Sequence, residues 1–145
     1  MRHIGVSSSL IIAIALLLFT PGIIDVVNGK LKGQSGCDVM LVLDGDTVEI
    51  NCSEHGLARG RIMGYDSPEM NARCVAEFIL AMRATWALRV MLWQAHTIEI
   101  KQNGKDKYNR DLITLQINGK NVQTHMISKG LARAYNGGKR GSWCL

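Results

Sequence analysis

The stretch VMLVLDGDTVEINC, residues 39–52, decides the fold because it contains two strands and the turn that joins them. Apolar and polar side chains alternate over Thr47–Cys52, which is the period of a half-buried strand. Residues 39–43 are an apolar run of strand length, and Asp44-Gly45-Asp46 is typical of a tight turn. We therefore expect an antiparallel hairpin at the start of the domain.

The apolar period changes twice downstream of this hairpin. We expect, in order, a strand over residues 57–65, a helix over 71–93, strands over 97–101 and 111–117, and a helix over 121–129. The long helix should bury the apolar side chains that recur at helical spacing, Val75, Ile79, Met82, Trp86 and Trp93. The smaller residues Ala81, Ala84, Ala87 and Leu88 should widen this buried face. Gly130 is a suitable left-handed stop for the last helix. This order fits an α+β fold, a five-stranded Greek-key β-barrel of the OB-fold type with two or more packed helices.

The N-terminal segment differs in composition from the rest of the chain. A basic start, Met1-Arg2-His3, precedes an uninterrupted apolar run from Leu10 to Phe19. This is the form of a secretory signal peptide, and a free-standing transmembrane helix is usually longer. The sequence therefore predicts export.

The cleavage site is not marked by an Ala-x-Ala triplet, and the best small-residue sites lie near Gly22 or at residues 27–29. Without cleavage, the apolar run would tether the protein to the membrane. A helix folded onto the domain is a third alternative. We expect residues 1–29 to be a signal peptide or N-terminal membrane anchor, 30–36 a flexible linker, and 37–145 the folded domain.

Four cysteines in a chain expected to be exported predict two disulfides, although sequence alone allows three pairings. Cys37 and Cys52 lie on opposite arms of the predicted hairpin and nearly face each other, so we prefer this pair. The second bridge would then join Cys74, near the start of the long helix, to Cys144 close to the C-terminus. Buried free thiols are the alternative.

Length and charge limit the function less than the motifs do. The 145 residues suffice for one domain with its own core once the N-terminal segment is set aside. The net charge is +5 at pH 7 and the pI is about 9.2. Excess Lys and Arg suit a polyanionic partner but also serve solubility, so charge alone does not decide the function.

Three short segments concentrate reactive side chains: Asp44 to Thr47, Arg61 to Glu69, and Lys107 to Arg110. Their carboxylates are hard oxygen ligands for a divalent cation, with one carboxylate to spare as a proton acceptor. Their guanidinium groups are planar, permanently charged donors that match phosphate. Together they are the parts needed for metal-assisted attack on a phosphodiester.

The same segments, in this order, resemble the thermonuclease family, the staphylococcal-nuclease-like (SNase-like) enzymes. The likeness runs from about Cys37 to Trp143, and the spacing Arg61-x4-Asp66-x-Pro68-Glu69 is its most specific part. The resemblance implies a Ca²⁺-dependent endonuclease that hydrolyses DNA and RNA with little sequence specificity and leaves 3′-phosphate ends. Single-stranded nucleic acid is the expected substrate, because a groove at a barrel end contacts backbone rather than paired bases. We expect a monomer without a protein partner.

The resemblance implies a Ca²⁺ site at Asp46, Asp66 and the carbonyl of Ser67. Two carboxylates brought to one barrel end repel each other, and this favours a bound cation. In the structural alternative, Asp46 caps the hairpin turn and Asp66 merely precedes Ser-Pro at a strand end. Asp44 is expected to orient the turn.

The resemblance implies catalytic roles for Glu69, Arg61 and Arg110. Glu69 would take a proton from the attacking water, and the two arginines would hold the scissile phosphate and stabilise its transition state. Glu69 could instead complement the start of the following helix, and either arginine could lie on a solvated basic face. The stretch after Glu69 is shorter than in well-known members, and Asn109 stands where Gly is usual.

Substrate contacts are implied for Lys107, Tyr108 and Tyr135. The first two match positions that contact a terminal or neighbouring phosphate, while Tyr135 would stack on a base or else be a packed or surface tyrosine. A second function class stays open, a non-catalytic module that binds a polyanion such as an exopolysaccharide at the cell envelope. We expect a secreted or periplasmic protein, or one anchored in the membrane and facing outside the cytoplasm.

Overall fold

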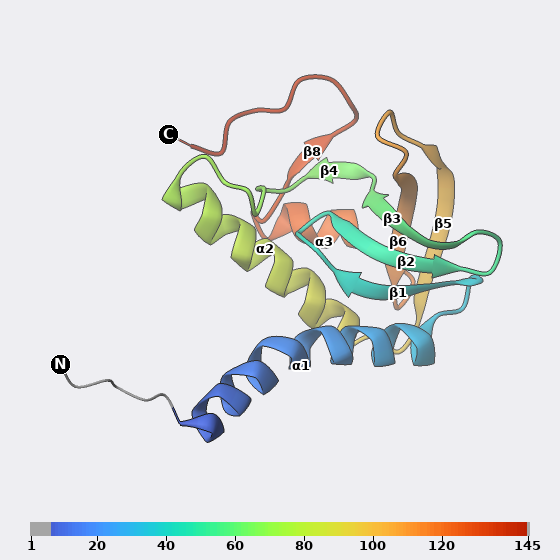
Figure 1. The fold of residues 1–145 in the computed structure, drawn as a ribbon. Helices are drawn as coiled ribbons and strands as arrows, with labels where there is room; N and C mark the ends of the chain where they lie inside the picture. The colour runs from blue at the N-terminus through green and yellow to red at the C-terminus, as the bar shows by residue number, and fades with distance from the viewer. Residues whose placement is uncertain (1–6, 145) are drawn as a thin grey trace.

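The computed structural model describes residues 7 to 144, and the basic start of the predicted signal segment lies outside them. Its larger sheet consists of β1 (Cys37–Val42), β2 (Thr47–Cys52), β3 (Gly56–Ile62), β5 (Ile98–Lys105), β6 (Asp111–Ile117) and the short β7 (Lys120–Asn121). The strand order is β1-β2-β3-β6-β5, with β3 and β6 parallel and the other neighbours antiparallel (Figure 1). The predicted OB-type barrel topology is confirmed.

The barrel interior is apolar because side chains alternate along its strands. In β6 every second residue is buried, and Ile113 and Leu115 are fully enclosed together with Val48 and Ile50 of β2. The segment before β1 approaches β5 from the other side, where the backbone N–H of Ile100 donates to the Ser35 hydroxyl at 2.8 Å. The two ends of the strand order, β1 and β5, thus approach each other as in an open barrel.

The strand expected over residues 57–65 is divided in two. Strand β3 ends at Ile62, and β4 (Gly64–Asp66) begins at Gly64, whose φ of +90° turns the chain. Strand β4 pairs instead with β8 (Arg133–Tyr135) in a separate two-stranded sheet. A side chain at Gly64 would also meet the amide of Gln123, with a nearest distance of 2.3 Å. The division turns Asp66 away from the barrel wall and toward the hairpin turn.

Helix α2 (Val75–Trp93) begins later than predicted, because Cys74 caps it and the sulfur of Cys74 accepts from the backbone N–H of Glu77. The expectation for its buried face is only partly confirmed. Ala81, Ala84 and Leu88 are buried against the barrel as expected. The expectation is wrong for the larger apolar side chains, since Val75, Ile79, Met82 and Trp86 are exposed and Trp93 is half-buried. Alanines face the barrel because the hairpin turn approaches this helix too closely for larger side chains.

Helix α3 (Val122–Ser128) lies within the predicted range. Asn121 caps it by accepting from the backbone N–H of Gln123 at 2.9 Å, and Gly130 follows in the left-handed conformation, with a φ of +65°. Both ends of the helix are therefore determined by local sequence.

Helix α1 (Ser8–Lys32) continues beyond the boundary expected at residue 29. Residues 30–32 of the expected linker are helical, and Gly33 bridges to Ile98 of β5. In Figure 1 the second part of α1 runs beneath β1 and α2, while its first part projects away from the barrel.

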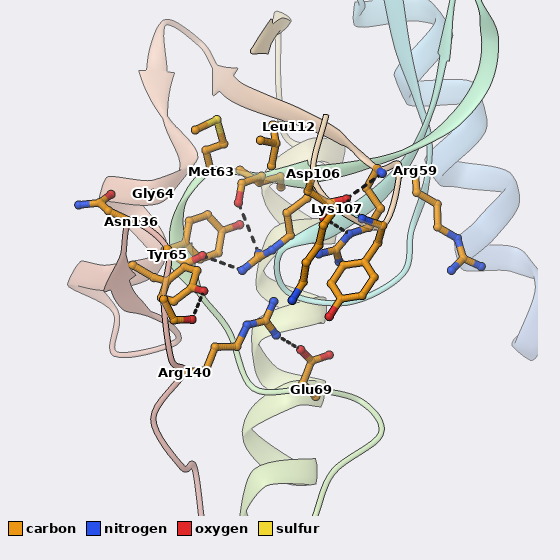
Figure 2. Close-up of a pocket in the computed structure, with 17 residues that line it drawn as sticks. Arg59, Met63, Gly64, Tyr65, Glu69, Asp106, Lys107, Leu112, Asn136 and Arg140 are labelled. Carbon is orange, nitrogen blue, oxygen red and sulfur yellow. Dashed lines mark hydrogen bonds and ion pairs between the residues drawn. The ribbon is translucent and has the colours of Figure 1, made fainter. Parts of the chain in front are cut away.

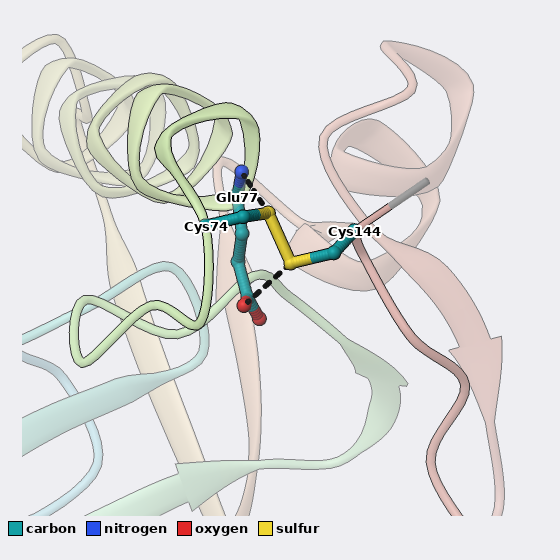
Figure 3. A group of neighbouring side chains, drawn as sticks. All are labelled: Cys74, Glu77 and Cys144. Carbon is teal, nitrogen blue, oxygen red and sulfur yellow. Dashed lines mark hydrogen bonds between the residues drawn. A yellow bond between two sulfur atoms is a disulfide. The ribbon is translucent and has the colours of Figure 1, made fainter.

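The structure contains both expected disulfides, Cys37–Cys52 across β1 and β2 and Cys74–Cys144 between α2 and the C-terminal tail. Figure 3 shows the buried Glu77 beside the second bridge, where its Oε2 lies 3.7 Å from Sγ of Cys144. Because both sulfurs are bonded to each other, this group offers no thiolate for a metal. The bridge fixes the tail against the body of the domain.

Candidate active site

The hairpin turn and the end of β4 meet at one end of the barrel. The carboxylate of Asp46 accepts from both the backbone N–H and the hydroxyl of Ser67, at 2.9 and 3.0 Å. The hydroxyl of Tyr65 donates to the carbonyl of Gly45 at 2.8 Å. A Cβ at Gly45 would lie 2.7 Å from that of Ala84, so only glycine permits this close approach. The predicted neighbours Asp46 and Asp66 are thereby brought together.

Arg61 lies between these two carboxylates and is 5% exposed. Its guanidinium is 2.6 Å from Oδ1 of Asp46 and 3.5 Å from Oδ1 of Asp66. It also donates to the carbonyl of Tyr65 at 3.1 Å. Arg61 therefore holds the cluster together as well as lining the adjoining pocket.

Negative charge exceeds positive charge within this cluster. Burial, followed by the charge of Asp46, raises the pKa of Asp44 to about 7. Burial also raises the pKa of Asp66, although Arg140 opposes the rise. Among the described atoms, Oδ1 of Asp66 is buried and accepts no hydrogen bond, although the guanidinium groups of Arg61 and Arg140 lie 3.5 and 3.1 Å from it. A buried carboxylate oxygen that is held only by ion pairs can take a cation as a further ligand.

The donor set fits a hard divalent cation. Asp46 and Asp66 supply carboxylate oxygens from two different elements, and Asp44 adds a third carboxylate close to Asp46. Ser67 contributes its backbone to the same corner, where its N–H and hydroxyl both point to Asp46. Oxygen ligands without a nearby thiolate or imidazole are the donors that Ca²⁺ and Mg²⁺ prefer.

Glu69 lies at the rim, with its side chain 47% exposed. It forms an ion pair with Arg140, whose Nε also lies 3.1 Å from Oδ1 of Asp66. Figure 2 shows these two side chains pointing toward each other across the pocket mouth. Arg140 was not predicted, because it comes from the C-terminal tail, which the Cys74–Cys144 bridge folds back over the site.

The β5–β6 turn supplies the opposite wall. Asn109 has a φ of +62°, a conformation that asparagine tolerates, so the turn forms without the usual glycine. Lys107 and Arg110 lie 4.9 and 5.6 Å from the ring of Tyr108, which is itself 69% exposed. Arg110 is oriented by Asp106, at 2.8 Å. Burial opposes the change, but hydrogen bonds from Arg110 and Tyr108 lower the pKa of Asp106.

A pocket of about 890 Å³ lies between these walls and the β4–β8 sheet. Its charged lining residues are Arg59, Arg61, Lys107, Arg110 and Arg140, set against Glu69 and Asp106. Tyr135 also lines it, and its hydroxyl donates to the carbonyl of Gly138 at 2.7 Å. Five cationic groups against two carboxylates make the pocket strongly attractive to an anion.

Comparison with known proteins agrees with this geometry. Residues 59–142 match the family described as staphylococcal nuclease homologue. An uncharacterized endonuclease from Haemophilus influenzae is 22% identical over 130 residues, which cover 90% of this chain and 66% of that protein. The chain thus spans just under two thirds of this relative's length. Because the family match covers more than half of the chain and includes both walls of the pocket, the chain belongs to the staphylococcal nuclease homologue family.

Proposed function

We propose that this protein is a Ca²⁺-dependent endonuclease that hydrolyses phosphodiester bonds in DNA and RNA with little sequence specificity. The proposal rests on one observation, that two different environments meet at the barrel end. A cluster of buried carboxylates opens onto a cationic pocket, and Glu69 and Arg140 lie where they meet. Family membership supports the same chemistry.

The pocket would bind the nucleic-acid backbone. Lys107 and Arg110 would contact phosphates, and the exposed ring of Tyr108 offers a stacking surface between them. Tyr135 is a second aromatic at the opposite wall. Single strands are the preferred substrate in this proposal, because an open groove with aromatic walls accepts unpaired bases.

Asp46, Asp66 and the carbonyl of Ser67 would hold the Ca²⁺ ion. When bound, the ion would neutralise phosphate charge and lower the pKa of a coordinated water. Glu69, half-exposed at the rim, would accept the proton of the attacking water.

Arg61 and Arg110 would stabilise the additional negative charge on the phosphate as the new bond to oxygen forms. Departure of the 5′ oxygen would leave a 3′-phosphate. The two arginines reach the pocket from different elements, β3 and the β5–β6 turn, so they would approach the phosphate from separate directions.

Residues 37–145 would form the nuclease unit and act as a monomer outside the cytoplasm. Two disulfides support this location, because such bonds persist in oxidising compartments.

A binding module for anionic polymers is the second candidate. The observation in its favour is Arg140, which neutralises Glu69 and Asp66 and so occupies the groups that hydrolysis needs. Such a module would keep the cationic pocket but would not depend on the carboxylate of Glu69.

The test is cleavage and binding of single-stranded DNA and RNA by the full chain in detergent. Wild type would be compared with Glu69→Gln and with Glu99→Gln, a control at an exposed position of β5, each with Ca²⁺ and with a chelator. We expect Ca²⁺-dependent cleavage that Glu69→Gln lowers by about 10²- to 10⁴-fold and Glu99→Gln leaves unchanged. Tight binding without cleavage in every sample would refute the enzyme and favour the binding module.

A further inference from the structure

Helix α1 has two parts with different surroundings. From Ser8 to Thr20 its side chains are exposed apart from a half-buried Ala15, although nearly all of them after Ser9 are apolar. From Pro21 onward the helix packs on the domain, and Asp25 and Gly29 are buried. The change occurs at Pro21, which lacks the N–H needed for the helical hydrogen bond and permits a bend.

Asp25 joins α1 to two elements of the barrel domain. It is 3% exposed, and its Oδ1 accepts from the indole N–H of Trp93 at 2.7 Å. Its Oδ2 accepts from Nε of Arg89 at 2.9 Å and from the backbone N–H of Val42 at 3.2 Å. Arg89 in turn donates to the carbonyl of Val42 at 2.8 Å. We call Asp25, Arg89, Trp93 and the backbone of Val42 the Asp25 clamp.

Beyond the clamp, Gly29 and Lys32 also fit the second part of α1 to the domain. A Cβ at Gly29 would lie 1.7 Å from the carbonyl oxygen of Val39, so α1 could not approach β1 this closely with any other residue. Lys32, near the end of the helix, donates to the carbonyl of Trp93 at 2.7 Å. The second part of α1 is therefore fitted to the domain by several independent contacts.

This fit conflicts with removal of the segment as a signal peptide. Cleavage at residues 27–29 would remove Asp25 and leave the largely buried guanidinium of Arg89 without its carboxylate. Cleavage near Gly22 would need the peptidase to cut within a continuous helix that already lies close to the domain, since a Cβ at Gly22 would lie 3.4 Å from Cδ1 of Leu41. Neither small-residue site lies in an open segment.

The apolar run of α1 is long enough to span a membrane. Residues 8–24 of the helix contain no charged side chain, and at 1.5 Å per residue they measure about 26 Å. The hydrocarbon core of a bilayer is about 30 Å thick, and helices of about 17 to 25 apolar residues cross it. Asp25 is the first charged residue after the run, so a spanning helix would place the clamp at the water boundary.

The clamp has the composition of a membrane–water interface. Trp86 is 42% exposed, its ring packs edge-on against Trp93 with centroids 5.9 Å apart, and Arg89 lies 5.2 Å from its ring. Tryptophan and arginine are favoured at this depth because each has an apolar body and a polar end.

Helix α2 extends this interface with its exposed face. The apolar side chains on that face are Val75, Phe78, Ile79, Met82, Trp86 and Val90. They recur at helical spacing along the whole of α2, and Trp86 and Val90 lie toward its C-terminal end beside the clamp, where α2 meets α1 (Figure 1). An apolar helix face continuous with a membrane anchor fits a lipid surface.

We propose that α1 is retained in the mature protein as a transmembrane anchor, and that the Asp25 clamp holds the barrel at the bilayer with the exposed face of α2 against lipid. The proposal does not depend on nuclease activity. In this proposal the anchor is packed against the barrel as part of the fold and is not joined to it through a flexible linker.

The first test is the intact mass and fractionation of the full chain expressed with its own N-terminus. We expect a mass that includes residues 2–145, membrane association that resists alkaline carbonate, and release by detergent. A soluble product whose N-terminus lies between residues 23 and 30 would overturn retention.

The second test measures the α2 contact by tryptophan quenching in nanodiscs with brominated lipids. Trp86→Phe should remove most of the quenched emission, whereas Trp143→Phe, in the tail, should raise the quenched fraction. Quenching that is unchanged by Trp86→Phe would overturn the contact between α2 and lipid, whatever the result of the first test.

Discussion

Two buried clusters of aspartate and arginine lie in the part of the chain that the structure describes, and they differ in how fully the hydrogen-bonding capacity of their side chains is used. In the Asp25 clamp both carboxylate oxygens accept hydrogen bonds, and one guanidinium faces one carboxylate. At the barrel end Arg61 is shared by Asp46 and Asp66, and among the described atoms Oδ1 of Asp66 accepts no hydrogen bond and is held only by ion pairs with Arg61 and Arg140. A satisfied cluster fixes a structure, whereas an unsatisfied one is suited to a ligand.

The largest expected effect is the loss of activity in Asp66→Asn. The substitution removes an oxygen charge that the proposed Ca²⁺ site requires, so we expect kcat on single-stranded DNA to fall by about 10³-fold. The free energy of unfolding of the metal-free protein should stay the same or increase, because a charge that burial disfavours is removed. Steady-state kinetics and urea denaturation of the same samples test both parts. A large loss of stability would mean that the two clusters are alike.

Asp25→Ala should show the opposite pattern. It leaves the guanidinium of Arg89 and the indole N–H of Trp93 without their acceptor, a change that costs about 3 kcal/mol in comparable buried pairs. We expect a lower free energy of unfolding. In the folded protein kcat should stay within about twofold of wild type, a difference of only about 0.4 kcal/mol in the activation free energy. Thermal denaturation in detergent measures the first quantity. Glu54→Gln, at an exposed turn, is the control. Unchanged stability would show that the clamp does not support the fold.

The pH dependence of stability distinguishes the clusters a third way. Asp44 has a pKa of about 7 in the fold, above the value near 3.9 of an unfolded chain. Between these values the folded state binds more protons than the unfolded state, so the free energy of unfolding of the metal-free protein should fall as pH rises from about 4 to 7. Asp44→Asn should flatten this fall, and Asp38→Asn on the same hairpin should not. Urea denaturation with chelator, repeated across this pH range, gives the slopes, and equal slopes in wild type and Asp44→Asn would contradict the prediction.

The sequence predicted the parts of the site that local spacing determines. The Asp-Gly-Asp turn, the range of the last helix and the αL positions at Asn109 and Gly130 each follow from residues within a few positions. The barrel topology followed from strand order, and the hairpin placed Cys37 opposite Cys52.

What the sequence did not predict depends on approach between distant segments. The apolar residues of α2 are spread over two helix faces, so the sequence does not decide which face is buried. The alanine face is buried in the structure because Gly45 of the hairpin turn lies against Ala84. The sequence assigned no role to Asp25, because its side-chain partners Arg89 and Trp93 are more than 60 residues away in α2. In each case a contact outside the local window decided the structure.

Replacement of Arg140 has the smallest expected effect, and it tests most specifically whether the barrel-end cluster lacks positive charge. Its guanidinium is 35% exposed and pairs with Asp66 and Glu69, so in metal-free protein it supplies part of the positive charge that the barrel-end cluster lacks. A half-exposed pair of this kind is worth at most about 1 kcal/mol. If Ca²⁺ and Arg140 compete for Asp66, Arg140→Ala should tighten Ca²⁺ binding by up to about 5-fold. Isothermal titration measures the affinity, and Lys139→Ala, at the preceding exposed position, controls for the general loss of a positive charge. Equally tighter Ca²⁺ binding in both variants would mean that only the net charge of the protein matters. Tighter binding confined to Arg140→Ala would mean that the guanidinium of Arg140 occupies the site until the metal displaces it.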